Sequence, residues 1–425
     1  MLASGRKPSA GLLRTHAAFR LVWCARTVSL LGDRFSLFAI PILALDKLHA
    51  TAGQAALLVA AQSLPGVIVA LPAATRLVGR SERATMIGCD LVRGLLLGGA
   101  VGLAEVHQLT MVALFACVVA IGATSTVFDV AAQAYVPKIV DRTDYVEANS
   151  RLAQADGGTW VAGPVLVGIL ISTAGPLAAI GVDAASFAVS WFLLIRITEP
   201  RSIPAAGSQA EGDEEDAGAW RRLVSGYRFA VRQRGIRAIV ISATLFNLGG
   251  AMVGSLWFPY LLRLLRIQPA LIGVLSTIGG ASALVTVLML RRVMRSASLA
   301  VILPASLVTG VLTLWLIPLA ARGQAIVLLA VYQLIFSAAA AAFGVVAASV
   351  RQLLTPQRYQ GRVYAFSLVV AGLSVPLGSV LASAVADSTS VLVAIVAGAL
   401  VASFSLVTVR ALAAASTAHG SESCL

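Results

Sequence analysis

Charged side chains inside long apolar stretches are the residues of this 425-residue sequence best suited to chemistry. They all precede residue 200 and are Arg26, Asp33, Arg34, Asp90, Arg93, Asp129, Asp156 and Asp183. An ionisable group near the centre of a bilayer costs at least about 2.5 kcal/mol, and those that remain usually face a cavity or a partner. We therefore expect proton or ion chemistry in the first half of the chain.

Asp33 is the preferred candidate for a proton-coupling site. It lies about halfway along its apolar stretch, and Arg26 lies seven positions earlier on the same helical face. Burial disfavours the ionised carboxylate, whereas a nearby arginine favours it. We predict that Asp33, with Arg26 and Arg34 beside it, binds a proton or contacts substrate. The alternative is a static salt bridge that locks one conformation.

Four other charges, those of Asp90, Arg93, Asp129 and Asp156, lie nearer the predicted cytoplasmic ends of their stretches, where gate or structural contacts are expected, whereas Asp183 lies toward the outer end of its stretch. Asp90 and Arg93 have the i, i+3 spacing of a pair on one helix face. The gate candidates are Asp90, Arg93, Asp129, Asp156, Arg80 and Arg83. For Asp183, a helix cap and a cavity-facing role both remain open.

Polar and aromatic residues of the second half predict the other wall of a substrate cavity. These candidates are Asn247, Gln333, Phe246, Trp257, Tyr332 and Phe336. The alternatives are that the polar residues join helices and that the aromatic residues pack or anchor at the membrane interface.

Features of an enzyme are missing from the sequence. The four histidines fall in predicted loops or tails, so no His, Cys and carboxylate cluster has metal-ligand spacing. No phosphate-binding G-x-x-x-x-G-K-[ST] loop and no serine–histidine or cysteine–histidine pair is visible. We predict no enzymatic activity, no cofactor and no metal.

Apolar segments of about 20 residues must position these side chains, because a helix of that length spans a bilayer. The chain is 58% hydrophobic and 12% charged, and the segments are apolar all round, unlike the alternating strands of a barrel. The sequence predicts an all-α membrane protein with twelve transmembrane helices. They cover 19–45, 51–74, 85–104, 109–133, 150–172, 176–196, 238–262, 269–290, 299–319, 324–349, 362–384 and 389–409.

The net charge of +13 is explained by orientation in a membrane. Most Lys and Arg fall on one side if both termini are cytoplasmic, which satisfies the positive-inside rule. We therefore expect a multi-pass protein of the cytoplasmic (inner) cell membrane, monomeric in the lipid bilayer. No nucleic-acid partner is predicted.

A polar segment divides the chain into two related halves. Residues 198–237 begin Pro/Gly/Ser-rich and acidic and continue as an amphipathic stretch, "AWRRLVSGYRFAVRQRG". Pairs such as "AAQAYVP" and "VRQLLTP" recur about 215 residues apart on either side of this linker. We expect two parallel six-helix repeats, 1–197 and 238–425, around a site near the midplane.

The segment "GTWVAGPVLVG" places Gly163, Pro164 and Gly168 inside one predicted helix. Proline kinks a helix, and small residues let neighbouring helices approach closely. Tight packing and a bend about which the halves rock are both compatible with this pattern.

Several of these motifs resemble the major facilitator superfamily, in particular its branch of macrolide-efflux proteins and enterobactin exporters. They are "LLRTHAAFRLVWCARTVSLLGD", "DVAAQAYVPKIVDRTDYVEANS" and "TPQRYQGRVYAF". The "GPVLVG" segment resembles the antiporter motif, which implies export. The loop "TRLVGRSERA" keeps Leu77, Arg80 and Arg83 of the family pattern but lacks its aspartate, so the gate must use other pairs, such as those of Asp90 or Asp129.

The resemblance and the residues together predict a secondary active transporter. The expected activity is proton-coupled export of a drug-like or secondary-metabolite small molecule. A siderophore exporter, a lysophospholipid flippase and a solute importer are the alternatives within this class. A membrane-embedded enzyme or a sensor is the alternative from another class.

Overall fold

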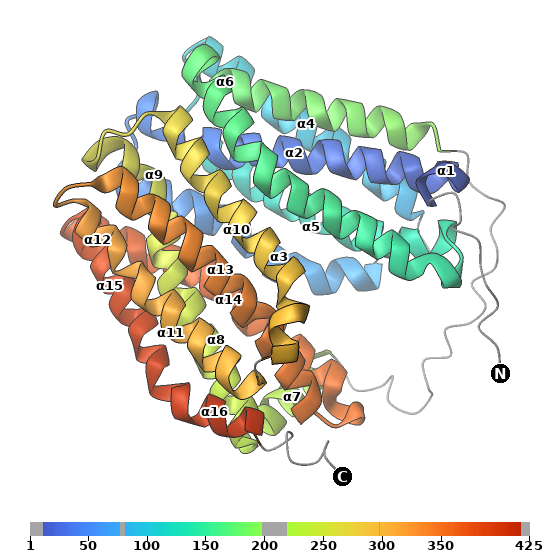
Figure 1. Ribbon diagram of the computed structural model, residues 1–425. Coiled ribbons are helices and arrows are strands. Elements are labelled where there is room, and N and C mark those ends of the chain that lie inside the picture. Colours follow the sequence, from blue (N-terminus) through green and yellow to red (C-terminus); the bar gives the residue numbers. More distant parts are fainter. Residues whose placement is uncertain (1–11, 77–80, 198–218, 297, 418–425) are drawn as a thin grey trace.

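The computed structural model describes residues 12–76, 81–197, 219–296 and 298–417 (Figure 1). Within these ranges every regular element is helical and none is a strand. The first half contains α1 (Leu12–Thr15), α2 (Ala17–Asp46), α3 (Ala52–Arg76), α4 (Glu82–Glu105), α5 (Met111–Ile139), the 3₁₀ turn η1 (Arg142–Asp144) and α6 (Tyr145–Ile195).

The second half begins with an amphipathic helix and continues with long apolar ones. Its elements are α7 (Ala219–Arg232), α8 (Arg234–Ser255), α9 (Trp257–Pro259), the π-helical turn η2 (Tyr260–Leu264), α10 (Pro269–Ser296), α11 (Leu299–Leu314), α12 (Leu316–Ala320), α13 (Ala325–Leu354), α14 (Gln357–Ser388), α15 (Val391–Ser403), the 3₁₀ turn η3 (Phe404–Thr408) and α16 (Val409–Thr417).

Eleven candidate membrane spans occur in the described residues, and one of them is long enough to cross twice. Helix α6 has 51 residues, too many for one crossing, and its chain turns at Gly175, where φ is 83°. Glycine is the residue that adopts this φ without strain, and Pro176 begins the second arm. The prediction of twelve spans, with a break between 172 and 176, is confirmed.

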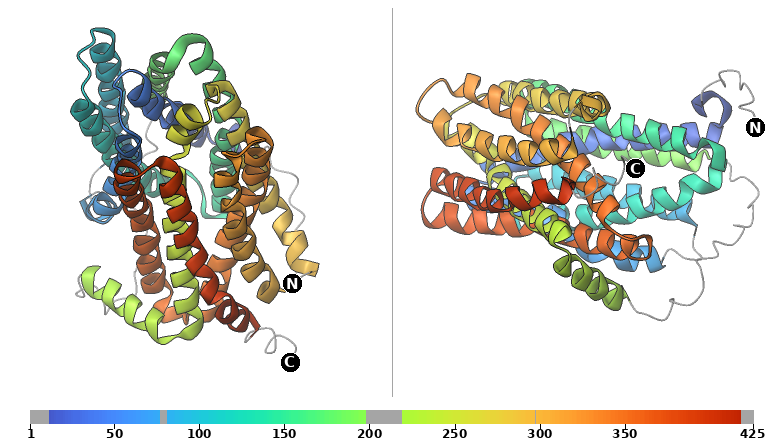
Figure 2. Two further views of the ribbon diagram at one scale, coloured as in Figure 1. Left: turned by 90° about the vertical axis from the view of Figure 1, so that its left-hand side faces the viewer. Right: turned by 60° about the horizontal axis from the view of Figure 1, so that its bottom comes forward.

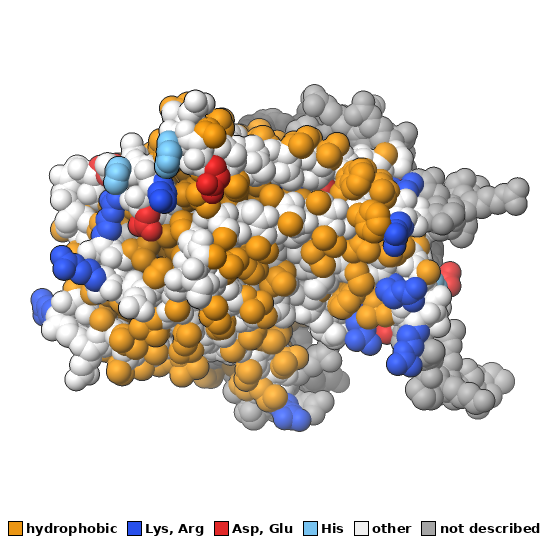
Figure 3. Space-filling view, turned by 90° about the horizontal axis from the view of Figure 1, so that it is seen from above, with side chains coloured by type: hydrophobic (Ala, Val, Ile, Leu, Met, Phe, Trp, Pro, Cys, Tyr) orange, Lys and Arg blue, Asp and Glu red, His pale blue; other side chains and the backbone are white. Residues whose placement is uncertain are grey.

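On the face shown in Figure 3, apolar side chains cover much of the middle, and charged side chains gather toward the two ends. Large apolar residues that a soluble domain would bury, such as Ile68, Leu95 and Leu288, are exposed. Such an extended apolar surface is stable in contact with lipid. The prediction of an all-α membrane protein is confirmed.

The helices form two bundles with matching internal contacts. In the first, α3 and α4 pack against α5; in the second, α10 and α11 pack against α13. Across the junction α3 packs against α14, and α10 packs against α6 (Figures 1 and 2). Exchanging the halves maps each of these cross-bundle contacts onto the other, as two parallel repeats require.

The two ends of the molecule differ. Helices α1, α7 and α16 lie at one end, here called the terminal face, toward which the two bundles splay apart (Figure 1). The loop of residues 47–51 lies at the other end, the distal face. The predicted span 238–262 is interrupted: α8 ends at Ser255, and the chain continues through α9 and η2 around Pro259, which supplies no backbone N–H.

The predicted amphipathic segment forms α7 and packs on the terminal end of the second bundle. Phe229 stacks on Tyr359 with ring centroids 4.6 Å apart. The Gln233 side-chain amide donates to the Leu354 carbonyl at 3.0 Å. Helix α7 is therefore held against α14 through its side chains, and Gln233, the residue between α7 and α8, bonds to the end of α13.

Candidate functional site

A cavity of about 740 Å³ lies between the two bundles. Its wall comes from α2, α3, α5 and α6 on one side and from α8, α9, α10 and α13 on the other. The lining includes Ser36, Phe38, Gln62, Asp156, Trp160, Pro164, Trp257, Phe258, Gly279, Gly280, Tyr332, Gln333, Phe336 and Ser337. Its size and its mixture of apolar, aromatic and few polar groups suit a small organic molecule.

Four of the six residues predicted for the second-half wall line this cavity: Trp257, Tyr332, Gln333 and Phe336. Tyr332 stacks on Phe336 at 5.1 Å and lies 5.8 Å from Trp257, between ring centroids. These three rings form a continuous aromatic surface.

The other two predicted residues do not line the cavity. Phe246 is buried behind the wall, with its ring centroid 5.7 Å from that of Phe336. Asn247 is exposed and lies two turns before Gly254, a lining residue, on the same face of α8. It therefore lies beside the cavity, toward the terminal face.

Gly279 keeps the polar part of this wall accessible. A Cβ atom at this position would lie 2.7 Å from Gln333 Oε1 and 2.8 Å from Ser337 Oγ. Any side chain on residue 279 would therefore cover or displace these two polar groups. Neither Gly279 nor Ser337 was predicted, because only the packing of α10 on α13 reveals their position.

On the first-half wall Arg34 and Asp156 form an ion pair at 2.9 Å between α2 and α6. The Arg34 guanidinium also lies over the Trp160 ring, 3.7 Å from its centroid. A Cβ atom on Gly163 would lie 2.7 Å from Arg34 Cβ, so this motif glycine makes room for the arginine. Two members of this group, Asp156 and Trp160, line the cavity.

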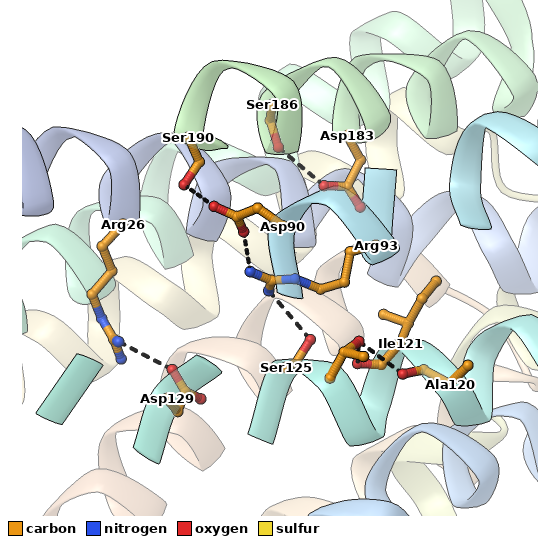
Figure 4. A network of polar contacts seen from close by, with 11 residues as sticks. Arg26, Asp90, Arg93, Ala120, Ile121, Ser125, Asp129, Asp183, Ser186 and Ser190 are labelled. Carbon is orange, nitrogen blue, oxygen red and sulfur yellow. Dashed lines mark hydrogen bonds and ion pairs between the residues drawn. The ribbon is translucent and has the colours of Figure 1, made fainter. Parts of the chain in front are cut away.

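A second space, of about 430 Å³, continues from the cavity toward the terminal face. The two spaces share Ala153 and Asp156, and the second one extends to Val22 and Pro137. Arg26 lines it and pairs with Asp129 at 3.0 Å, joining α2 to α5 (Figure 4). Arg26 thus forms its ion pair with Asp129 and not with Asp33.

Asp90 and Arg93 form the ion pair that their spacing predicts, and both are almost fully buried. The Ser190 hydroxyl donates to Asp90 at 2.6 Å, and Arg93 donates to the Ser125 hydroxyl at 3.4 Å (Figure 4). All these partners belong to the first bundle, so the pair joins α4, α5 and α6 inside it. None of these contacts reaches the second bundle, so they give no support to a gate between the bundles at Asp90 and Arg93.

Asp33 is half-buried and makes no hydrogen bond or ion pair with any residue that the structure describes. The static salt bridge considered for it is therefore not formed within that part of the chain. Asp183, whose place the sequence left open, is 1% exposed and accepts hydrogen bonds from the Ser36 and Ser186 hydroxyls. It faces α2 inside the bundle and does not cap a helix.

The gate candidate Arg83 lies at the terminal face. Arg83 donates to the carbonyls of Leu194 and Ile195 at 2.9 and 2.7 Å, and so caps the carboxyl end of α6. Arg80 lies outside the described residues.

His16, Asp141 and Asp144 also come together at this face, with candidate ligand atoms within 4.8 Å of one another. The sequence did not predict this cluster, because loop residues far apart in the chain form it. Exposed clusters of this kind are common without a metal.

Glycines and a proline let α6 and α10 cross closely between the bundles. Cβ atoms at Gly273 and Gly280 would overlap the carbonyl oxygens of Pro164 and Trp160, and one at Gly168 would lie 2.9 Å from the Pro269 oxygen. Pro164 and Gly168 are thus at the junction, while Gly163 packs inside the first bundle.

The junction is closed from the middle of the molecule to the distal face. Among described residues, four hydrogen bonds join the bundles. Their donor and acceptor residues are Thr277 and Val161, Ala270 and Ser172, Arg263 and Leu45, and Gly53 and Asp387. None lies near the terminal face.

The last two of these bonds hold the ends of two neighbouring helices. Arg263 donates to the Leu45 carbonyl at 3.0 Å, at the carboxyl end of α2. Asp387 accepts from the Gly53 amide at 3.1 Å, at the amino end of α3. Each charge has the sign that its helix end favours. Arg263 and Asp387 are together called the distal latch below.

Solved structures of transporters share this fold. The chain superposes on the nucleoside transporter NupG with a TM-score of 0.68 and 13% identity, covering 94% of this chain and 98% of that one. A bacterial homologue of the iron transporter ferroportin in the inward-facing state superposes with a TM-score of 0.67 and 18% identity, covering 94% of this chain and 99% of that one. A bacterial ferroportin homologue in the outward-facing state superposes with a TM-score of 0.57 and 16% identity, covering 93% of this chain and 99% of that one.

Sequence comparison agrees with the fold at the level of the superfamily. No curated protein matches the chain significantly. Residues 22–320 match the family model described as Major Facilitator Superfamily, which is well over half of the chain. With twelve membrane crossings, two matching bundles and a cavity between them, the chain belongs to the major facilitator superfamily and is a transporter of that type.

Proposed function

We propose that this transporter exports an amphipathic small molecule, drug-like or a secondary metabolite, across the cytoplasmic membrane in exchange for protons. The first bundle corresponds to residues 1–197 and the second to 238–425. The segment 198–237 connects them on the cytoplasmic side. The terminal face is then cytoplasmic, as the distribution of Lys and Arg requires.

The cavity between the bundles is the observation that carries this proposal. Its aromatic surface of Trp257, Tyr332 and Phe336 offers contact area to an apolar body. Gln333 offers a hydrogen-bond donor and acceptor, and Asp156 a carboxylate. A ligand with a large apolar part and one or two polar groups satisfies all of these at once.

The closed distal face supports an inward-facing state that can take up substrate from the cytoplasm. All described hydrogen bonds between the bundles lie between the middle and the distal face. The higher TM-score against the inward-facing ferroportin homologue agrees, 0.67 against 0.57 for the outward-facing one. Export then requires that the distal latch open and the terminal side close.

Exchange for protons supplies enough free energy for such export. One proton gains about 2.3 kcal/mol from a potential of about 100 mV and about 1.4 kcal/mol from one pH unit. Together these sustain a substrate gradient of several hundredfold. Asp33 is the proposed proton carrier.

Transport by purified protein in proteoliposomes tests the proposal. We expect an imposed pH gradient to drive accumulation of the dye ethidium or of a labelled macrolide, and an uncoupler to abolish it. A labelled siderophore and a labelled lysophospholipid serve as competing substrates in the same vesicles. Accumulation that persists with the uncoupler rules out proton exchange, and accumulation of only one competing substrate changes the substrate class.

A further inference from the structure

The charges within the spans of the first half do not balance. Three arginines well inside these spans each pair with one aspartate: Arg26 with Asp129, Arg34 with Asp156, and Arg93 with Asp90. Two acids, Asp33 and Asp183, are left without an ion pair among the described residues. A buried charge without a partner is expensive, so these acids are where a proton binds with least opposition.

Asp183 occupies a site built for a carboxyl group. It is 1% exposed, and the hydroxyls of Ser36 and Ser186 donate to its two oxygens. Gly32 faces it from α2, where a Cβ atom would overlap Asp183 Oδ1 and the Ser186 hydroxyl. The site therefore depends on a glycine, two serines and the close approach of α2 to α6.

Ser36 connects this site with the cavity. It lines the cavity wall, and its hydroxyl contacts Asp183. A hydroxyl group both donates and accepts, so it can pass a proton between water in the cavity and the carboxyl behind it. Asp183 itself has no place on the cavity wall.

Asp33 is the residue after Gly32 and interacts electrostatically with Asp183. The charged groups around the two acids are Arg34 on α2, Asp90 and Arg93 on α4, and Asp129 on α5. Two carboxylates at one buried location resist simultaneous ionisation, since each charge disfavours the other.

We propose that Asp183 and Asp33 together bind the transported proton, and that Ser36 passes it between this pair and the cavity. This proposal rests on proton-coupled export and adds Asp183 and Ser36 to its machinery. In the inward-facing state the pair releases its proton through Ser36 to the cytoplasmic side. In the outward-facing state it takes one up. Each transfer moves one proton between the carboxyl pair and water in the cavity, and no other chemical change takes place.

The test compares driven transport with exchange in the same proteoliposomes. An inside-to-outside pH difference of one unit drives about tenfold accumulation per proton. We expect Asp183→Asn to reduce ethidium accumulation to the level seen without a gradient. Counterflow of ethidium, which needs no net proton movement, is expected to stay within about twofold of wild type.

Matched variants distinguish a role of Ser36 in proton transfer from a purely structural role. Ser36→Ala removes a hydroxyl that reaches Asp183, and we expect it to slow pH-driven transport more than it slows counterflow. Ser242→Ala is its control, because that buried hydroxyl bonds only to a carbonyl of its own helix. Asp141→Asn, at an exposed carboxyl, is the control for Asp183→Asn.

The outcomes distinguish the two proposals. If Asp183→Asn accumulates ethidium under a pH gradient as well as the wild type does, the assignment of Asp183 is wrong, but proton-coupled export still holds. If accumulation by the wild-type protein does not depend on the pH gradient, proton-coupled export itself is refuted. Accumulation that requires a sodium gradient instead means that the acids hold sodium, which also overturns the proton assignment.

Infrared difference spectroscopy of the reconstituted protein gives a substrate-independent readout. The carbonyl stretch of a protonated carboxyl group is expected in wild type and absent in Asp183→Asn at the same pH. An unchanged spectrum contradicts proton binding at Asp183 even if transport is lost, because loss of transport alone also follows from misfolding.

Discussion

Arg34 links three features of the cavity wall. It pairs with Asp156, lies over Trp160 and fills the space that Gly163 leaves open. The pair leaves little net charge on this wall, so the cavity can accept a ligand through apolar contact. Removing either partner changes the charge that a ligand meets.

Asp156→Asn is expected to weaken the binding of cationic ethidium about tenfold, since the wall then loses its carboxylate and the charge of Arg34 beside it is no longer balanced. Binding of a neutral macrolide is expected to change much less. Tryptophan fluorescence quenching measures both, and Asp129→Asn, which removes the partner of Arg26, serves as the comparison. Equal losses for both ligands contradict a charge effect.

Gly279→Val is expected to raise the Kd of transported ligands about tenfold, because the new side chain covers Gln333 and Ser337. Gly98→Val is the matched control, since nothing lies within 4 Å of the corresponding Cβ position. Ligand binding by the purified proteins measures both. A Kd for Gly279→Val equal to that of the control refutes a role for this polar wall.

At the scale of elements, the crossing of α6 over α10 depends on the absence of side chains. Gly273 and Gly280 allow carbonyl oxygens of α6 to contact the backbone of α10. Because both helices line the cavity, their crossing also sets the relative position of its two walls.

Gly280→Leu is expected to reduce the transport rate at least about tenfold, with about 1–3 kcal/mol of destabilisation from overpacking. Gly344→Leu, on a glycine with open space around it, is expected to retain the wild-type rate. Proteoliposome transport and thermal unfolding in detergent measure both. Normal transport by Gly280→Leu means that the crossing need not be close.

The distal latch is the other feature that belongs to this scale. Each of its charges stabilises a helix end by about 0.3–1 kcal/mol. Removing both in Arg263→Gln with Asp387→Asn is expected to shift the inward-to-outward ratio about three- to thirtyfold. Distances between spin labels on the distal face measure this shift. Arg322→Gln, an exposed distal arginine, is the control, and an unchanged ratio in the double variant contradicts the latch.

Local features of the chain were predictable, whereas contacts between distant helices were not. Apolar runs predict the spans, and the turn before Pro176 predicts the break in α6, because these depend on neighbouring residues. The aromatic wall followed from its position in the second-half spans. Gly53 and Asp387 are 334 positions apart, and Asp183 meets Ser36 only through the packing of α6 on α2. Such contacts depend on the register of packed helices, which spacing along one helix does not determine.

At the scale of the whole molecule, the two bundles contribute different kinds of side chain to the site. The first contains the charges within its membrane spans, including Asp33 and Asp183, and the second supplies the aromatic surface and Gln333. Both contribute to one cavity, so a rotation of one bundle on the other changes its access while keeping both walls near the ligand. Proton binding in the first bundle can then bias the position of the second.

Distances between spin labels across both faces under changing pH test this account most directly. One pair joins the bundles at the terminal face, at Asp141 and Gln357, and the other at the distal face, at Gln108 and Arg322, all four exposed. Protonation is predicted to change the two distances in opposite directions, and Asp183→Asn with Asp33→Asn is predicted to abolish their pH response. Distances that stay fixed, or that rise and fall together, would contradict alternating access driven by protons.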